Sequence, residues 1–168
     1  MKGLLRTMAG AVERIRRNHA LEHATIHMLA PMAGGAHLAG CTLGSGFLIM
    51  GPVPTQIVEI ATSRALQGLT ADPGLAVHPR CGTNLAVAGL LAGALLSVAE
   101  SSRPRGLRAW LWRGLALGIA ALLARPAGLW AQRHLTTSGH VEGMGIAGIR
   151  RLRWGRWTLH HVVTRYTG

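Results

Sequence analysis

Charged side chains are scarce in this sequence, and acidic ones are the scarcest. Charged residues make up 14% of the chain, against about 25% in an average soluble domain. Six acidic residues stand against 18 lysines and arginines, which gives a formal net charge of +12. Such a basic, weakly charged protein suits a surface of anionic lipid, and we therefore expect the lipid bilayer as a partner.

Phenylalanine, tyrosine and cysteine are nearly absent as well. One Phe and one Tyr leave no platform on which bases stack among arginines, so we expect no nucleic-acid partner. Cys41 and Cys81 are too few for a disulfide framework, although one disulfide between them stays open. Residues 1–17 contain no apolar run long enough for a signal peptide.

Two long apolar stretches occupy residues 85–99 and 109–131. The first is shorter than the roughly 20 residues that span a bilayer, but residues 81–84 extend it. The second holds Arg113 and Arg125, whose long side chains reach opposite interfaces from within a membrane. Tryptophans lie at both of its ends, as in interfacial belts: Trp110, Trp112 and Trp130. The pattern predicts a transmembrane helical hairpin over residues 85–131, and the alternative is a buried helical hairpin of a soluble protein.

Each apolar stretch carries a G-x-x-x-G motif, which lets helices approach closely in a membrane. The glycines are Gly89 and Gly93 in the first stretch, and Gly114 and Gly118 in the second. We expect them to bring the two helices together, and they are also the surface through which other membrane proteins would bind.

The remaining segments alternate between helix and strand patterns, which predicts an α+β fold: a small mixed helix/sheet part with an inserted two-helix transmembrane hairpin. Three regions follow: residues 1–84, with the N-terminal helix, a β-hairpin and a histidine-rich metal-site region; residues 85–131, the membrane hairpin; and residues 132–168, C-terminal strands that pack on the N-terminal part. The predicted helices are residues 1–30 and 54–69, and the predicted strands are residues 37–42, 47–50, 75–77, 141–152 and 157–165.

The sequence His19-Ala20-Leu21-Glu22-His23 is the most informative polar stretch. Histidines four apart project from one face of a helix, one turn from each other, and can share a metal ion. Glu22 lies beside the pair and could orient a ligand or take a proton from water. The pattern H-x-x-E-H resembles the signature of the inverted zinc metalloproteases. That resemblance implies zinc bound by His19 and His23, with Glu22 as the catalytic general base.

Further ligands are needed to complete a tetrahedral site, and the segment from His78 to Asn84 offers the best ones. His78 is the expected third ligand, and Cys81 is an additional ligand that favours zinc over magnesium or calcium. His27 is four residues after His23, so it forms a second pair or supports the first. Other histidines and cysteines are less persuasive candidates: His37, Cys41, His140, His160 and His161.

Together, the motifs N-H-x-L-E-H-A-T-I-H and H-P-x-C-G-T-N resemble an uncharacterised bacterial membrane-protein family, a domain of unknown function. The resemblance starts at Asn18 and covers most of the chain beyond it. It implies an integral membrane protein, here of the bacterial inner (plasma) membrane, and it supplies no established activity.

Three functions remain open from the sequence. The first is a membrane-anchored, zinc-dependent hydrolase of the peptidase type. The second is a non-enzymatic membrane subunit whose histidines bind a structural metal, haem or a pigment. The third is an assembly factor without metal. Arg103, Arg105 and Arg108 between the apolar stretches favour a cytoplasmic loop, but the larger basic flanks favour cytoplasmic termini, and we expect the latter.

Overall fold

The computed structural model describes residues 2–101, 105–155 and 157–167. Arg103, part of the topology prediction, lies outside these residues. The chain forms two compact units. The first combines Met1–His78 with Thr136–Gly168, and the second is Pro79–Leu135, inserted between those two segments. The hairpin predicted over residues 85–131 lies within this insertion.

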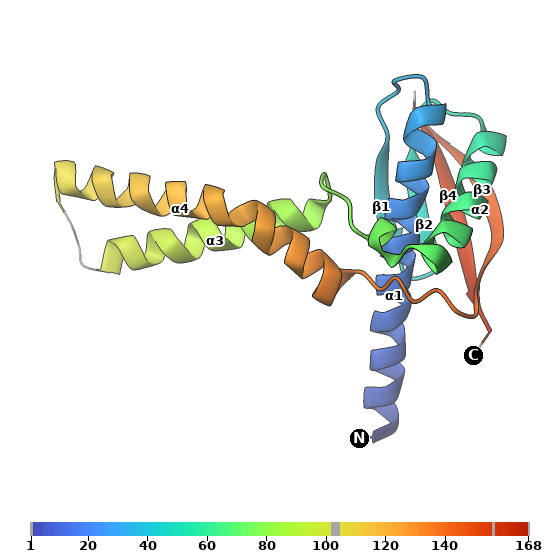
Figure 1. Cartoon of the computed structure of the whole chain (residues 1–168), viewed down its shortest axis with the longest axis horizontal. Helices are drawn as coiled ribbons and strands as arrows, with labels where there is room; N and C mark the ends of the chain where they lie inside the picture. The colour runs from blue at the N-terminus through green and yellow to red at the C-terminus, as the bar shows by residue number, and fades with distance from the viewer. Residues whose placement is uncertain (1, 102–104, 156, 168) are drawn as a thin grey trace. The chain divides into compact units, whose positions relative to one another are not determined.

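The first unit is built around α1 (Lys2–Leu29), a single long helix with two different halves. The half near the N-terminus is exposed and carries apolar residues at helical spacing, among them Leu5, Met8 and Val12. The other half is buried, and Ala20, Leu21 and Ala24 are fully inaccessible to solvent. This half packs against the sheet and against α2 (Thr55–Ala71), as Figure 1 shows.

Four strands form one antiparallel sheet in the order β1-β2-β4-β3. They are β1 (Ala39–Leu43), β2 (Gly46–Met50), β3 (Met144–Trp154) and β4 (Trp157–Tyr166). Phe47 and Ile49 of β2 lie opposite Val162 and His160 of β4, and all four side chains are buried. Directly opposed residues in antiparallel strands share a face, so this face is the one covered by the helices.

The α+β fold predicted from the sequence is confirmed, including the joining of the C-terminal strands to the N-terminal β-hairpin. The strand predicted at residues 75–77 is wrong, because Pro73–Ala76 form the 3₁₀-helix η2. Asp72 caps this helix by accepting a hydrogen bond from the backbone N–H of Gly74 at 2.8 Å. Pro73 occupies the first turn of η2 and has no N–H to give to a strand ladder.

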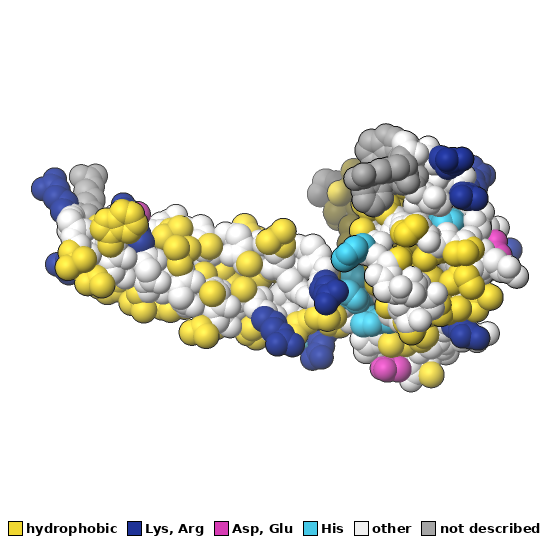
Figure 2. All heavy atoms as spheres, turned by 90° about the horizontal axis from the view of Figure 1, so that it is seen from above, with side chains coloured by type: hydrophobic (Ala, Val, Ile, Leu, Met, Phe, Trp, Pro, Cys, Tyr) yellow, Lys and Arg dark blue, Asp and Glu magenta, His cyan; other side chains and the backbone are white. Residues whose placement is uncertain are grey.

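The second unit is a pair of packed helices, α3 (Gly82–Ser101) and α4 (Leu107–Ala131). A short π-helix, Gln132–Thr136, continues α4. Both helices are long and apolar enough to cross a membrane, with none of the α3 window and 22% of the α4 window buried. Figure 2 shows hydrophobic side chains along this unit, with basic side chains near both ends. The core helix of a soluble protein would be mostly buried, so the exposure favours a membrane hairpin over the soluble alternative.

The expected glycine contact between α3 and α4 is wrong. A Cβ atom added at Gly89, Gly93, Gly114 or Gly118 would meet no atom within 4 Å. Gly128 is the close approach instead, since a Cβ there would lie 2.4 Å from Oδ1 of Asn84. A G-x-x-x-G motif indicates that another helix can approach closely, but it does not indicate which helix does so.

Candidate metal centre

Three histidines of α1 lie on one face because they are spaced four residues apart. His19, His23 and His27 therefore project at intervals of about 6 Å along the helix axis. The rings of His19 and His23 are in edge-to-face contact, with centroids 4.3 Å apart. His78 comes to the same face from the segment after η2, and its ring centroid is 4.6 Å from that of His27 and 5.7 Å from that of His23.

His19 and His23 use the same ring nitrogen for hydrogen bonding to the backbone. Nδ1 of His23 is 2.7 Å from the carbonyl oxygen of Ala76, and Nδ1 of His19 is 3.0 Å from that of Thr136. A carbonyl oxygen only accepts, so Nδ1 must donate its proton in both rings. In a neutral imidazole the lone pair then lies on Nε2, which is how metal-binding histidines are commonly fixed.

The spacing of the two rings is compatible with a shared ion. One ring nitrogen of His19 and one of His23 lie within 4.8 Å of each other. In a tetrahedral zinc site, bond lengths of about 2.05 Å place two ligand nitrogens about 3.3 Å apart. The two nitrogens are of the type that zinc binds, and they would have to come closer by up to about 1.5 Å to share one ion.

His27 is held differently from the other two. Its Nε2 lies 3.2 Å from the carbonyl oxygen of Val77, which leaves Nδ1 as the nitrogen that would face a metal. His23 and His27 thus fix two consecutive carbonyls, those of Ala76 and Val77, directly before His78. Their contribution to the site is therefore also to position His78 beside α1.

Glu22 is buried, with 6% of its surface exposed, and it lies against strand β1. Its carboxylate accepts a short hydrogen bond from the hydroxyl of Thr42. The space it occupies is provided by Gly40, where an added Cβ would lie only 2.2 Å from Oε1 of Glu22. The sequence prediction placed Glu22 beside the histidines as a base, and the structure adds that β1 fixes the position of its carboxylate.

Asn18 is a polar anchor to which sequence reasoning assigned no role. It is fully buried, and its side-chain N–H group donates to the carbonyl oxygen of Leu43 at 2.9 Å. Its Oδ1 accepts from the hydroxyls of Thr164 and Tyr166, at 2.8 and 2.7 Å. Asn18 thereby ties α1 to both β1 and β4 one residue before His19. An asparagine, which is a poor helix former, in the interior of the predicted helix was the available signal.

A second polar cluster fixes the chain where it returns from the second unit. Glu13 accepts hydrogen bonds from Ser138 and from Arg17, at 2.6 and 3.1 Å. Arg16 donates to the carbonyl oxygen of Thr137 at 3.0 Å, and the N–H of Ser138 donates to the carbonyl of Arg16. Burial opposes ionisation, but these hydrogen bonds and the two guanidinium charges outweigh it and lower the pKa of Glu13. The cluster places Thr136, whose carbonyl orients His19.

The motif around Cys81 belongs to the second unit and caps α3. The thiol of Cys81 accepts a hydrogen bond from the backbone N–H of Thr83 at 3.4 Å, which is the position of a helix N-cap. Asn84 donates to the carbonyl oxygen of Pro79 at 2.8 Å and accepts from Gln132 of the π-helix at 2.7 Å. These contacts give the residues after His78 a structural reason to be polar.

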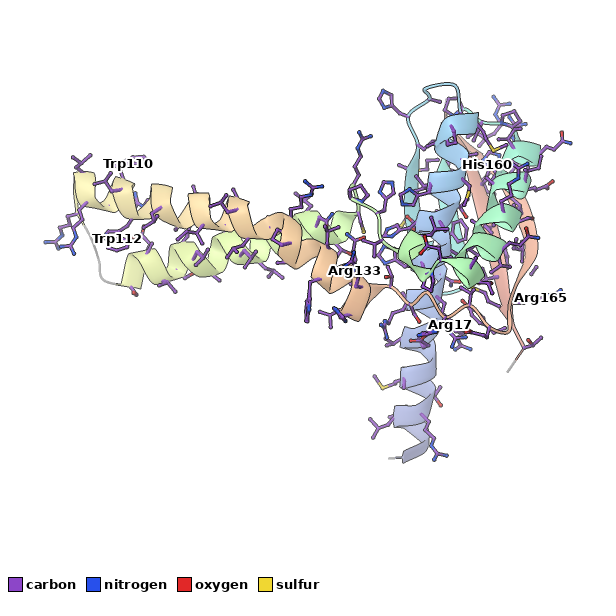
Figure 3. All side chains as sticks on the ribbon, in the orientation of Figure 1. Arg17, Trp110, Trp112, Arg133, His160 and Arg165 are labelled. Atoms are coloured by element: carbon purple, nitrogen blue, oxygen red, sulfur yellow. The ribbon has the colours of Figure 1, made fainter. Side chains whose placement is uncertain are left out.

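The histidines that the sequence ranked lower have other surroundings. His160 is fully buried on β4, where its Nε2 is 3.1 Å from the hydroxyl of Thr55. His161 lies on the opposite face of the strand, 3.4 Å from Ser45. His37, His140 and Cys41 are exposed. Figure 3 shows His160 in the first unit, on the sheet.

Comparison with known proteins gives a family but no activity. The family described as "Domain of unknown function (DUF6391)" matches residues 14–149, which include α1 from Arg14 on and the whole second unit. An uncharacterized protein of Picosynechococcus sp. (strain PCC 7002) is 36% identical over 135 residues, covering 74% of this chain and 66% of the relative. The chain thus spans slightly less than two thirds of that relative's length. No solved structure matches this chain.

Proposed function

The chain belongs to this family of unknown function, and we propose that it is a membrane-anchored metal-binding protein with zinc as the ion. The observation that carries the proposal is the hydrogen bonding of His19 and His23. Both rings donate Nδ1–H to a backbone carbonyl, so in the neutral imidazole each leaves Nε2 as the nitrogen that can bind metal. Solvated surface histidines have no reason to share this arrangement, since water satisfies either nitrogen.

His78 is the third ligand in this proposal. Its ring lies 5.7 Å from that of His23, and the carbonyls before it are fixed by His23 and His27. Cys81 follows three residues later, within about 11 Å of extended chain, and is a candidate fourth ligand by that reach. His27 either supports His78 or forms a second pair with His23.

Zinc in such a site is structural or catalytic, depending on whether one coordination position stays open. In the catalytic form, zinc held by His19, His23 and His78 would supply Lewis-acid chemistry, and Glu22 would be the base that takes a proton from water. The hydrogen bond from Thr42 favours the structural form, because it commits the carboxylate to β1. Two candidates follow. The H-x-x-E-H motif supports a zinc-dependent hydrolase, and the hydrogen bond between Thr42 and Glu22 supports a non-enzymatic metal-binding subunit.

The first experiment is elemental analysis and an optical spectrum of the full-length protein in detergent. We expect about one zinc per chain and no visible absorption. His23→Ala should lose most of the metal because His23 belongs to both histidine pairs, whereas the exposed His37→Ala should retain it. Unchanged metal content in His23→Ala would contradict the proposal, and a haem or pigment spectrum would replace zinc with that cofactor.

Glu22→Gln separates the two forms of the proposal. The amide has the same shape and can still accept the hydrogen bond from Thr42, but it cannot take a proton. A hydrolase should keep its zinc and lose peptide cleavage by about 100-fold or more. Cleavage that survives this change would leave Glu22 a positioning role, and a wild-type protein that binds zinc without cleaving peptides would be the subunit or assembly factor.

The membrane part of the proposal places α3 and α4 across the bacterial inner membrane, with both termini in the cytoplasm. The exposed apolar surface of both helices supports insertion. Alkaline carbonate should leave the protein in the membrane pellet, and its release would contradict insertion. In a cysteine-free background, an impermeant reagent should label a cysteine at Ser101 and not one at Thr167, and the reverse pattern would invert the topology.

A further inference from the structure

A groove at the closed end of the α3–α4 pair combines a basic rim with an apolar floor. It has a volume of about 640 Å³, which is within the usual range of about 300–1,000 Å³ for small-molecule sites. Arg105, just before α4, and Arg108, in its first turn, line the groove, and Trp112 follows one helical turn later. The rest of the lining is almost wholly apolar and comes from both helices: Leu95, Val98, Ala99, Leu115, Ala116 and Ile119, with Ser101 at the end of α3.

The arginines of this end are not equivalent. Arg113 forms an ion pair with Glu100 across the two helices and lies 5.7 Å from the ring of Trp110. Within the described ranges, no ion pair forms at Arg105 or Arg108. Glu100 is the only acidic residue of the second unit and is already paired. Two positive charges at the rim are therefore left for a negative group from outside the chain.

We propose that this groove binds one anionic phospholipid, with the phosphate at Arg105 and Arg108 and an acyl chain along the apolar floor. Guanidinium groups bind phosphate oxygens through paired N–H donors, and the apolar lining suits hydrocarbon. Along α4, Trp112 comes between Arg108 and the apolar lining residue Leu115, and tryptophan is enriched at membrane interfaces. Figure 3 shows Trp110 and Trp112 at this end of α4. The proposal rests on the membrane assignment but not on the metal site.

The test uses the full-length protein in mild detergent, titrated with phosphatidylglycerol or phosphatidylcholine of the same acyl chains and followed by native mass spectrometry. We expect the wild type to bind phosphatidylglycerol more tightly than phosphatidylcholine. The affinity for phosphatidylglycerol should be lowered about tenfold or more in R105Q/R108Q. The matched control R125Q/R133Q removes the same charge from α4 and the π-helix outside the groove, and should bind like the wild type. Equal binding of both lipids, or equal losses in the two variants, would overturn the proposal.

Tryptophan quenching tests the placement of the acyl chain. Phosphatidylglycerol with brominated chains should quench the fluorescence of the wild-type protein. Trp112→Phe should remove the part of this quenching that comes from the groove. Trp110→Phe should retain it, because Trp110 is 71% exposed and lies outside the groove. Displacement by millimolar inorganic phosphate would overturn the lipid assignment in favour of a free-phosphate site. Zinc content should be the same in all four variants, and carbonate extraction tests membrane insertion separately. Failure of the lipid proposal can therefore be distinguished from failure of the metal or membrane proposals.

Discussion

In the first unit, Asn18, Glu22 and His23 are buried, whereas in the second unit Leu85, Leu90 and Leu122 are each more than 70% exposed. The same chain thus buries polar groups in one place and exposes apolar groups in another. Burial of these polar groups is tolerated because each has a hydrogen-bond partner within the first unit. Exposing leucine side chains to water is unfavourable, whereas exposing them to the hydrocarbon of a membrane is not. The membrane hairpin proposed above accounts for this difference.

The largest expected effect is loss of the polar anchor in the first unit. Asn18→Leu removes the partner of the Leu43 carbonyl and of the Thr164 and Tyr166 hydroxyls. The two hydroxyls keep other acceptors, the carbonyls of Ser45 and Arg14. Each of the three lost hydrogen bonds is worth about 1 kcal/mol, so we expect a loss of about 3 kcal/mol. Hydrogen exchange of the β4 amides measures it. Thr70→Ala, at an exposed hydroxyl, is the control, and equal protection in the two variants would contradict the anchor.

A smaller effect is expected from crowding Glu22. Gly40→Ala places a methyl group 2.2 Å from the present position of Oε1, so the carboxylate or β1 must shift. Overpacking of this kind costs about 1–3 kcal/mol. Gly44→Ala is the matched control, since its Cβ would meet no atom within 4 Å. Urea unfolding followed by circular dichroism compares them, and equal midpoints would show that Glu22 is not confined by β1.

A pH effect is expected at His160, in the core of the first unit. Burial lowers the pKa of His160 below its ordinary 6.5, and the charge of Arg151 on the neighbouring strand adds to this. The unfolded chain then takes up the proton more readily, so stability is complete above about pH 6.5 and falls as the pH drops toward the lowered value. His160→Gln should flatten this fall in urea titrations at several pH values. His37→Gln should not, and identical slopes for both would contradict the prediction.

The smallest effect is expected at the outward glycines of the second unit. Gly89→Ala and Gly118→Ala should change the stability of the purified protein by less than about 1 kcal/mol, because neither Cβ meets an atom within 4 Å. Gly128→Ala should lower it more, since Asn84 lies in the way. Thermal unfolding in detergent ranks the three. Loss of a co-purifying membrane protein in Gly89→Ala, without loss of stability, would identify these glycines as a partner surface, as the sequence predicts.

The sequence alone determined the elements whose patterns are local. The long N-terminal helix, both β-hairpins and the two apolar helices follow from periodicity and from turn residues, within a few residues of their observed ends. The i, i+4 spacing of His19 and His23 also settled that the two rings share a face. These features depend on neighbours along the chain, which the sequence displays directly.

Only the tertiary structure decided which distant groups meet. Thr136 and Ala76 orient the two histidines through backbone carbonyls, and a carbonyl leaves no mark on residue type. The contact of Glu22 with Thr42 and Gly40 depends on how β1 packs under α1. The same holds for the close approach at Gly128, which the G-x-x-x-G motifs did not indicate. Such contacts arise from packing between elements far apart in sequence, and packing is satisfied by shape and hydrogen bonding rather than by a motif.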